Sequence, residues 1–305
     1  MKKTTPFTFY TIASAMIFSL SMISCSTQNT DVYVNQMNIP DEYKIGGVAV
    51  GLQAYTFNRF SVMEAIEKTA KAGGKLIELY PGQRLNADDD ELIFNHLSSD
   101  EDIEKVKAKL DEHGIMAINY GVVSLSDEED SRKVFEFANT MGIQAVTSEP
   151  SMEDMDRLEE LVKEYDVMLA IHNHPARPDD PDYRVWDPEY VLSMVEGRDP
   201  RLGACADIGH WARSEIVPIE GLKILEGRII SMHMADVDQL NRDGEDVVNG
   251  YGIGNIGGVL DELRRQNFGG HISLEYEANW DDNVTDVAQN IGFIHGWIQN
   301  RDHDN

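Results

Sequence analysis

The sequence predicts an α/β protein whose fold is a single (β/α)8 TIM barrel. Two observations favour this fold class: short apolar runs alternate with longer amphipathic runs, and the pair repeats eight times within roughly 260 residues, a size typical of such barrels. A doubly wound sheet consists of the same strand–helix units and is the alternative. No change of composition divides the repeats, so we expect one barrel domain over residues 45–305.

The strand candidates are short runs rich in apolar residues, as expected for strands buried in a parallel sheet. In chain order they cover residues 48–55, 75–80, 116–120, 145–148, 168–173, 202–207, 229–235 and 271–276. The amphipathic runs between them predict helices over residues 62–73, 102–114, 130–142, 155–165, 187–197, 219–227, 258–270 and 285–300. Several of these runs stop at glycine, which commonly ends a helix.

Residues 1–25 have the features of a signal peptide rather than of the fold. Lys2 and Lys3 precede an uncharged, mostly apolar run over residues 7–23, and the run ends in MISC at Cys25. This pattern resembles a bacterial lipoprotein signal, which implies lipidation of Cys25. The polar residues 26–44 are then expected to form a tether. We therefore expect a protein of the cell envelope, periplasmic or surface-facing, that contacts the membrane only through a lipid anchor.

The charge balance excludes several classes of partner. The chain has 54 Asp and Glu against 26 Lys and Arg, a net charge of −28. A protein that binds nucleic acid or an anionic membrane surface needs the opposite sign, so we expect a small-molecule partner instead. Besides Cys25 the chain has only Cys205, which lies between two alanines and is expected to be a buried small side chain. A homo-oligomer is compatible with the sequence.

Acidic and histidine side chains gather at the predicted ends of strands, where barrels of this kind carry their functional groups. The strand ends are Tyr55, Tyr80, Tyr120, Glu149, His172 to His174, Asp207 with His210, His233 with Asp236, and Glu275 with Glu277. Among them Glu149, Asp207, His233 and Glu275 supply three carboxylates and one imidazole. This set suits a divalent ion, with Mn²⁺ as first choice and Zn²⁺, Co²⁺, Mg²⁺ or Fe²⁺ as alternatives. Each residue alone would fit a salt bridge or a packed core, so the prediction depends on the four together.

The same motifs carry a family resemblance. GLQAYTFN, SVMEAIEKTAKAGGKLIELY, SEP, HNH, DIGH, HMAD and SLEYE occur in the order found in xylose isomerase-like TIM barrels, the sugar phosphate isomerase/epimerase group. The resemblance covers nearly all of residues 45–300. It implies a metal held by Glu149, Asp207, His233 and Glu275. It also implies four catalytic residues: Glu149 and Glu275 exchanging a proton through an enediolate, and His174 and His210 as acid–base or substrate-binding groups.

These observations predict a metal-dependent sugar isomerase or epimerase that removes a proton α to a carbonyl. No glycine-rich helix start has basic residues beside it, so we expect a non-phosphorylated sugar. Substrate contacts are expected from Tyr55, His172, Trp186 and Glu277. A 3-keto-glycoside lyase or hydratase would need the same metal site, and a sugar-binding lipoprotein without catalysis is the third hypothesis.

Two other signals are less informative. Gly252, Gly254 and Gly257 match the dinucleotide pattern G-x-G-x-x-G, but a polar loop rather than a strand precedes them, so no nucleotide is expected. Residues 241–258 and 175–190 are expected to cover the site, with Trp186 either stacked on a sugar or packed. The DNA-repair endonuclease branch of the resembling family is excluded, because tyrosines stand where that branch needs histidines.

Overall fold

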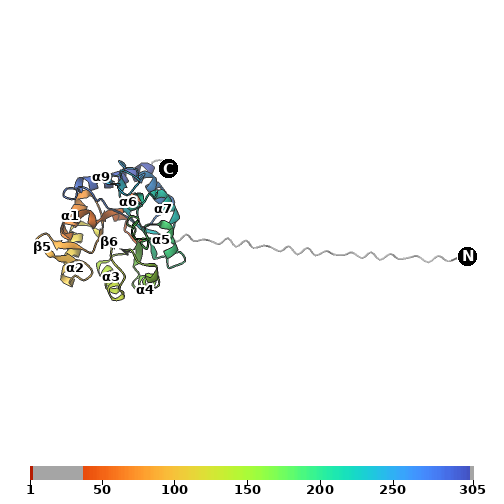
Figure 1. The fold of residues 1–305 in the computed structure, drawn as a ribbon, viewed down its shortest axis with the longest axis horizontal. Coiled ribbons are helices and arrows are strands. Elements are labelled where there is room, and N and C mark those ends of the chain that lie inside the picture. Colours follow the sequence, from red (N-terminus) through yellow and green to blue (C-terminus); the bar gives the residue numbers. More distant parts are fainter. Residues whose placement is uncertain (3–36, 303–305) are drawn as a thin grey trace. The chain divides into compact units, whose positions relative to one another are not determined.

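The computed structural model describes residues 1–2 and 37–302, and the described residues 37–302 belong to one compact unit. Eight parallel strands of this unit close into a barrel, since the last strand pairs with the first, and the predicted (β/α)8 TIM barrel is confirmed (Figure 1). The strands are, around the barrel, β2 (Val48–Gln53), β3 (Leu76–Leu79), β6 (Met116–Tyr120), β7 (Ala145–Ser148), β8 (Met168–Ile171), β9 (Leu202–Asp207), β10 (Ile229–Met234) and β13 (His271–Leu274).

Helices follow the strands and surround the barrel (Figure 1). They are α1 (Val62–Ala72), α2 (Asp100–His113), α3 (Glu128–Met141), α4 (Met155–Tyr165), α5 (Pro188–Val195), α6 (Ile208–Arg213), α7 (Pro218–Ile224), α8 (Ile256–Arg265) and α9 (Val284–Asp302). Ser61 and Glu64 form a capping box at the start of α1, and Gly73 ends that helix in a left-handed conformation. None of the helices in the described part of the chain is long and apolar enough to cross a membrane.

Several short elements were not predicted from the sequence. The hairpin of β4 (Gln83–Asn86) and β5 (Asp89–Phe94) lies between β3 and α2, and β11 (Asp236–Val237) pairs with β12 (Asp246–Val247) after β10. Three 3-10 turns cover Asp41–Tyr43, Ala54–Phe57 and Met152–Asp154. The β5 strand is acidic and exposed over most of its length, so it lacks the apolar alternation by which a strand is recognised.

The N-terminal end of the barrel is closed by the chain itself. Met37 and Ile39 are 6% and 4% exposed and pack on an inner layer of small or apolar side chains: Ala49, Leu76, Ile118, Ala145, Ala170, Cys205 and Ile230. β1 (Lys44–Ile45) then pairs with β2. The predicted tether over residues 26–44 therefore needs correction at its end, because from Met37 the chain is held on the barrel by apolar burial. Cys205 is buried and free, as predicted. The predicted signal peptide and Cys25 lie outside the described residues, apart from residues 1–2.

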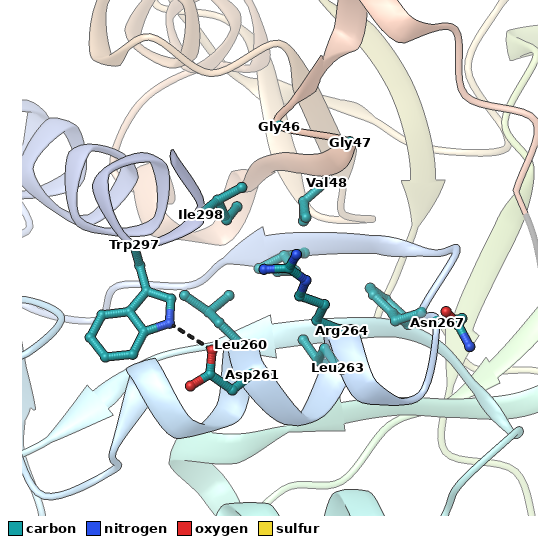
Figure 2. Close-up of a pocket in the computed structure, with 12 residues that line it drawn as sticks. Gly46, Gly47, Val48, Leu260, Asp261, Leu263, Arg264, Asn267, Trp297 and Ile298 are labelled. Carbon is teal, nitrogen blue, oxygen red and sulfur yellow. Dashed lines mark hydrogen bonds between the residues drawn. The ribbon is translucent and has the colours of Figure 1, made fainter. Parts of the chain in front are cut away.

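A cavity of about 260 Å³ lies between the β1–β2 turn, α8 and α9, at the strand starts (Figure 2). Its walls include Val48, Leu260, Phe268 and Ile298, and Trp297 donates a hydrogen bond to Asp261 across 3.1 Å. The predicted catalytic residues belong to the opposite end of the barrel, where the strands finish. This cavity is therefore separate from the candidate site.

Candidate metal centre and active site

Four side chains converge at the C-terminal ends of the strands. His172 follows β8, Asp207 ends β9, His233 lies in β10 and Glu275 follows β13. One potential ligand atom from each of the four lies within 4.8 Å of the others. The barrel brings them together because parallel strands end on one face, where side chains from separate parts of the chain meet.

The geometry of this group fits a metal ion. His233 Nδ1 lies 2.8 Å from Glu275 Oε2 and 3.9 Å from Asp207 Oδ2, and His172 Nε2 lies 3.6 Å from the same Asp207 oxygen. Both imidazole nitrogens are buried, and among the described residues neither has a partner in proper hydrogen-bond geometry, although His233 Nδ1 lies close to the Glu275 carboxylate. A buried polar atom without a partner costs free energy, and a cation between these four groups would remove that cost.

Glu78 in β3 holds His233 in place and is not among the site residues predicted from the sequence. Its Oε2 lies 3.0 Å from His233 Nε2 and accepts a hydrogen bond from Ser273 over 2.8 Å. Glu78 is fully buried in the barrel. A carboxylate on the far nitrogen of a metal-binding imidazole fixes the ring and its tautomer. The available signal was an acidic residue between the apolar Ile77 and Leu79 in the middle of the predicted strand KLIELY.

Asp207 is positioned by its own helix and by a neighbouring strand end. Its Oδ1 accepts the backbone N–H of His210 over 2.7 Å, so it caps α6. The Asn173 side chain bonds to both the backbone N–H and the backbone carbonyl of Asp207, each over 3.0 Å. The Oδ2 atom is thereby left to face His172 and His233.

The pKa values follow from burial and from these charge pairs. Burial alone would lower the pKa of His172, but the carboxylates of Asp207 and Glu149 outweigh it and raise that pKa to about 10. The pKa of His233 is also raised despite burial, by Cys205, Glu78 and Glu275. Without a metal, protons on these imidazoles balance the buried carboxylates.

Glu149 belongs to a second group, with His172 and His174. Its Oε1 lies 3.0 Å from His172 Nδ1 and 2.5 Å from His174 Nδ1, and accepts the Tyr183 hydroxyl over 3.0 Å. Burial would raise the pKa of Glu149, but His172 and His174 hold it well below its usual range. Of the four predicted ligands, the structure thus groups Asp207, His233 and Glu275 with His172, and Glu149 contacts the other nitrogen of His172.

The group of His172, Asp207, His233 and Glu275 lies at a cavity of about 420 Å³, a volume within the range of small-molecule sites. Its walls include most of the side chains predicted to act on or bind a substrate: Tyr55, His172, His174, His210, Glu275 and Glu277, joined by Gln53, Tyr80, Gly121 and Val122. The rings of His174 and His210 stack at 5.1 Å between centroids. Trp186, predicted as a possible sugar platform, is half-buried and does not line this cavity, and Tyr120 is buried with its hydroxyl at His96.

Two cavity residues have pKa values shifted in opposite directions. Burial, and repulsion by Glu275, Asp246 and Asp207, raise the pKa of Glu277 to about 8. Burial lowers the pKa of His210 to about 4, against the opposing charge of Asp207. At neutral pH the walls of the cavity therefore include a largely protonated carboxyl and an unprotonated imidazole, a combination suited to proton transfer.

The loop over residues 241–258 is organised by the Asp236 carboxylate. Its Oδ2 accepts the backbone N–H groups of Gly250 and Gly252 over 2.8 and 3.0 Å, and its Oδ1 accepts that of Gly254 over 2.9 Å. A Cβ at Gly252 would collide with Asp236, so glycine is needed there. The glycine pattern thus serves a loop wrapped around a carboxylate.

Comparisons with known proteins agree with this fold. A family model described as xylose isomerase-like TIM barrel matches residues 66–296. A crystal structure of an uncharacterised protein from Parabacteroides distasonis is 34% identical over 81% of this chain and 98% of its own, with a TM-score of 0.66. No curated protein matches the chain in sequence.

Two more distant structures share the fold. A D-tagatose 3-epimerase-like protein is 17% identical, with 84% of this chain and 98% of its own covered and a TM-score of 0.66. The IolI protein with a bound zinc atom is also 17% identical, with 83% and 98% covered and a TM-score of 0.63.

Proposed function

Because the chain belongs to the xylose isomerase-like TIM barrel family, we propose that it is a metal-dependent enzyme of the sugar isomerase and epimerase type. Its reaction would begin with removal of a proton α to a carbonyl of a non-phosphorylated sugar. The observation that carries this proposal is the group of His172, Asp207, His233 and Glu275, with two buried imidazole nitrogens that have no partner in proper hydrogen-bond geometry among the described residues.

The donor set limits the choice of metal. Two imidazoles and two carboxylates suit Mn²⁺, Zn²⁺, Fe²⁺ or Co²⁺ better than Mg²⁺, which prefers oxygen ligands. We propose Mn²⁺ first, as the sequence predicted, and note that a zinc atom is bound in the IolI structure. Such an ion would polarise the sugar carbonyl and stabilise the negative charge that develops on its oxygen.

The residues around the metal group supply the proton transfers. Glu275 reaches the metal group and lines the cavity, so its carboxylate is placed to take the α-proton and leave an enediolate. His174 and His210 stack on the cavity wall and can hold or return a proton at the neighbouring oxygen. Glu149 contacts Nδ1 of both His172 and His174 and so holds the two rings in place. Its predicted roles in proton exchange and as a metal ligand remain predictions.

A lyase or hydratase acting on 3-keto-glycosides is the second proposed function. It would begin with the same proton removal, followed by departure of the C1 substituent. The stacked His174 and His210 support this second function, because an acid on the cavity wall can protonate a leaving oxygen.

The test is solvent deuterium exchange, followed by NMR, into non-phosphorylated ketoses and 3-keto-glucosides. The Mn²⁺-loaded chain should incorporate deuterium α to the carbonyl of at least one sugar, and chelation of the metal should stop it. The product then separates the two reactions, since an epimer supports the first and loss of the C1 substituent supports the second. No exchange on any sugar, combined with sugar binding, would support a non-catalytic sugar-binding protein instead.

A further inference from the structure

A second cavity, of about 370 Å³, lies beside the metal-site cavity. Glu149 lines the second cavity, and His174 lines the first. The two side chains are joined by the 2.5 Å contact between Glu149 Oε1 and His174 Nδ1. The two cavities are therefore neighbours, one on each side of this pair of side chains.

The outer wall of the second cavity is the loop over residues 172–187, between β8 and α5. Three prolines restrict its backbone, at positions 175, 178 and 181. The loop is also tied down at Ala176, whose N–H donates to Ser214 Oγ over 2.9 Å and whose carbonyl accepts from Arg242 over 2.6 Å. A wall restrained in this way is largely formed before a ligand arrives.

Two arginines stack on tyrosines at this cavity. The Arg177 guanidinium carbon lies 3.7 Å from the centre of the Tyr183 ring, and that of Arg184 lies 4.0 Å from the centre of the Tyr190 ring. Stacking leaves the N–H donors of a guanidinium at its edge, where they can reach a ligand. Arg177 Nη2 is 3.9 Å from Glu149 Oε2, beyond the length of a direct hydrogen bond.

The charges around the cavity decide which kind of ligand it fits. The two arginines face the carboxylates of Asp180, Asp182 and Glu149, so the lining does not favour an anion. Planar donors, carboxylate acceptors and the hydroxyl of Ser151 instead match a neutral ring with many hydroxyl groups, and aromatic rings suit its apolar face.

We propose that this second cavity binds the second sugar ring of a neutral glycoside, while the first ring lies in the metal-site cavity. The inference rests on the proposed function, since it places the reacting ring at the metal. It narrows the substrate class from free hexoses to disaccharides or larger glycosides, because a single ring would occupy only one of the two neighbouring cavities.

The test compares neutral disaccharides with hexoses, using calorimetric titration of the full Mn²⁺-loaded chain. The probes are cellobiose, maltose and lactose against glucose and galactose. At least one disaccharide should bind about tenfold more tightly than either hexose. This is the gain in affinity expected when a ligand forms hydrogen bonds with a charged group. Arg184→Ala should remove this difference and leave hexose affinity unchanged. Arg184 is exposed, so its replacement should not unfold the chain, and thermal melting checks this.

The matched control is Arg59→Ala, in another cavity of about 370 Å³ beside Trp280. This variant should keep the disaccharide preference. The proposal is overturned if Arg59→Ala rather than Arg184→Ala removes the preference, if both sugar classes bind equally, or if no disaccharide binds. Deuterium exchange measured on the same sample separates the two proposals. If the chain catalyses exchange but does not prefer disaccharides, only the second-ring site is wrong. If it prefers disaccharides but catalyses no exchange, only the catalytic proposal is wrong.

Discussion

Two imidazole nitrogens decide what the site can hold. His172 Nε2 and His233 Nδ1 are buried, face Asp207 and have no partner in proper hydrogen-bond geometry within the described chain, while Glu149 and Glu78 contact the opposite nitrogens of the two rings. Each ring is therefore oriented by one carboxylate and presented toward a shared point. This arrangement is the usual one around a protein-bound transition metal.

His172→Ala should weaken metal binding more than about 100-fold, because loss of an outer partner alone typically costs 10–100-fold. His174→Ala is the matched control, since His174 also contacts Glu149 but lies outside the four-residue group. It should retain the metal. Competition with a fluorescent chelator measures both affinities, and equal losses in the two variants would contradict the assignment of His172 as a ligand.

Metal affinity should rise with pH. The pKa of His172 is raised to about 10 and that of His233 is also raised, so both rings carry an extra proton at neutral pH. A metal ion must displace these protons in order to bind. Binding should release about two protons per ion, and affinity should fall as the pH falls. In the metal-free chain the raised values add stability below about pH 6.5 that is lost as the pH rises through the folded pKa. Chelator competition at pH 6, 7 and 8 checks this, and a flat profile would contradict it.

At the scale of elements, strand interiors were predicted well and their ends less well. The strands over residues 116–120, 145–148 and 202–207 match the sequence prediction, whereas those predicted to end at 55 and 276 end at Gln53 and Leu274. The residues just beyond these strand ends lie outside the sheet, and among them Tyr55 and Glu275 line the metal-site cavity. The hairpin of β4 and β5 escaped prediction because its exposed acidic face has no apolar alternation.

The candidate site could be predicted only in part. Strand-end chemistry led to Asp207, His233 and Glu275, and these three do meet. It placed Glu149 in the fourth position, whereas the structure groups His172 with the other three, because that position depends on how the backbone turns after Ser148 and Ile171. Glu78 was missed because its partners are distant in sequence: His233 and Ser273 reach it only after the barrel closes.

Glu78→Gln in β3 should lower metal affinity by about 10–100-fold, because the amide cannot orient and polarise His233 as a carboxylate does. Glu67→Gln is the control, since Glu67 lies exposed on α1, paired with Lys109. It should leave metal affinity unchanged. The same chelator competition measures both variants, and wild-type affinity in Glu78→Gln would show that the buried carboxylate is structural only.

Asp236→Ala should destabilise the chain by about 3 kcal/mol, because its carboxylate accepts three backbone N–H groups of the glycine-containing loop. Asp243→Ala, exposed in the same loop, should cost little. Urea unfolding gives both free energies. If Asp236→Ala unfolds at the same urea concentration as wild type, the loop is not organised as described.

At the scale of the whole molecule, the barrel separates structure from chemistry. Its N-terminal end is closed by Met37, Ile39 and an apolar inner layer, while its C-terminal end collects the titratable groups. The net charge of −28 disfavours binding to the negative phosphates of nucleic acid, and a small-molecule partner stays a prediction of the sequence. Export as a lipoprotein through Cys25 stays a prediction of the sequence.

Bound metal tests the account most directly. The full chain, loaded with Mn²⁺ and freed of excess by gel filtration, should carry about one ion per chain by plasma mass spectrometry and should melt at a higher temperature than the chelated chain. His233→Ala should carry none and should show no such shift. No retained ion in the wild-type chain after loading with Mn²⁺, Zn²⁺ or Co²⁺ would contradict the account and leave the strand-end carboxylates and imidazoles as structural ion pairs.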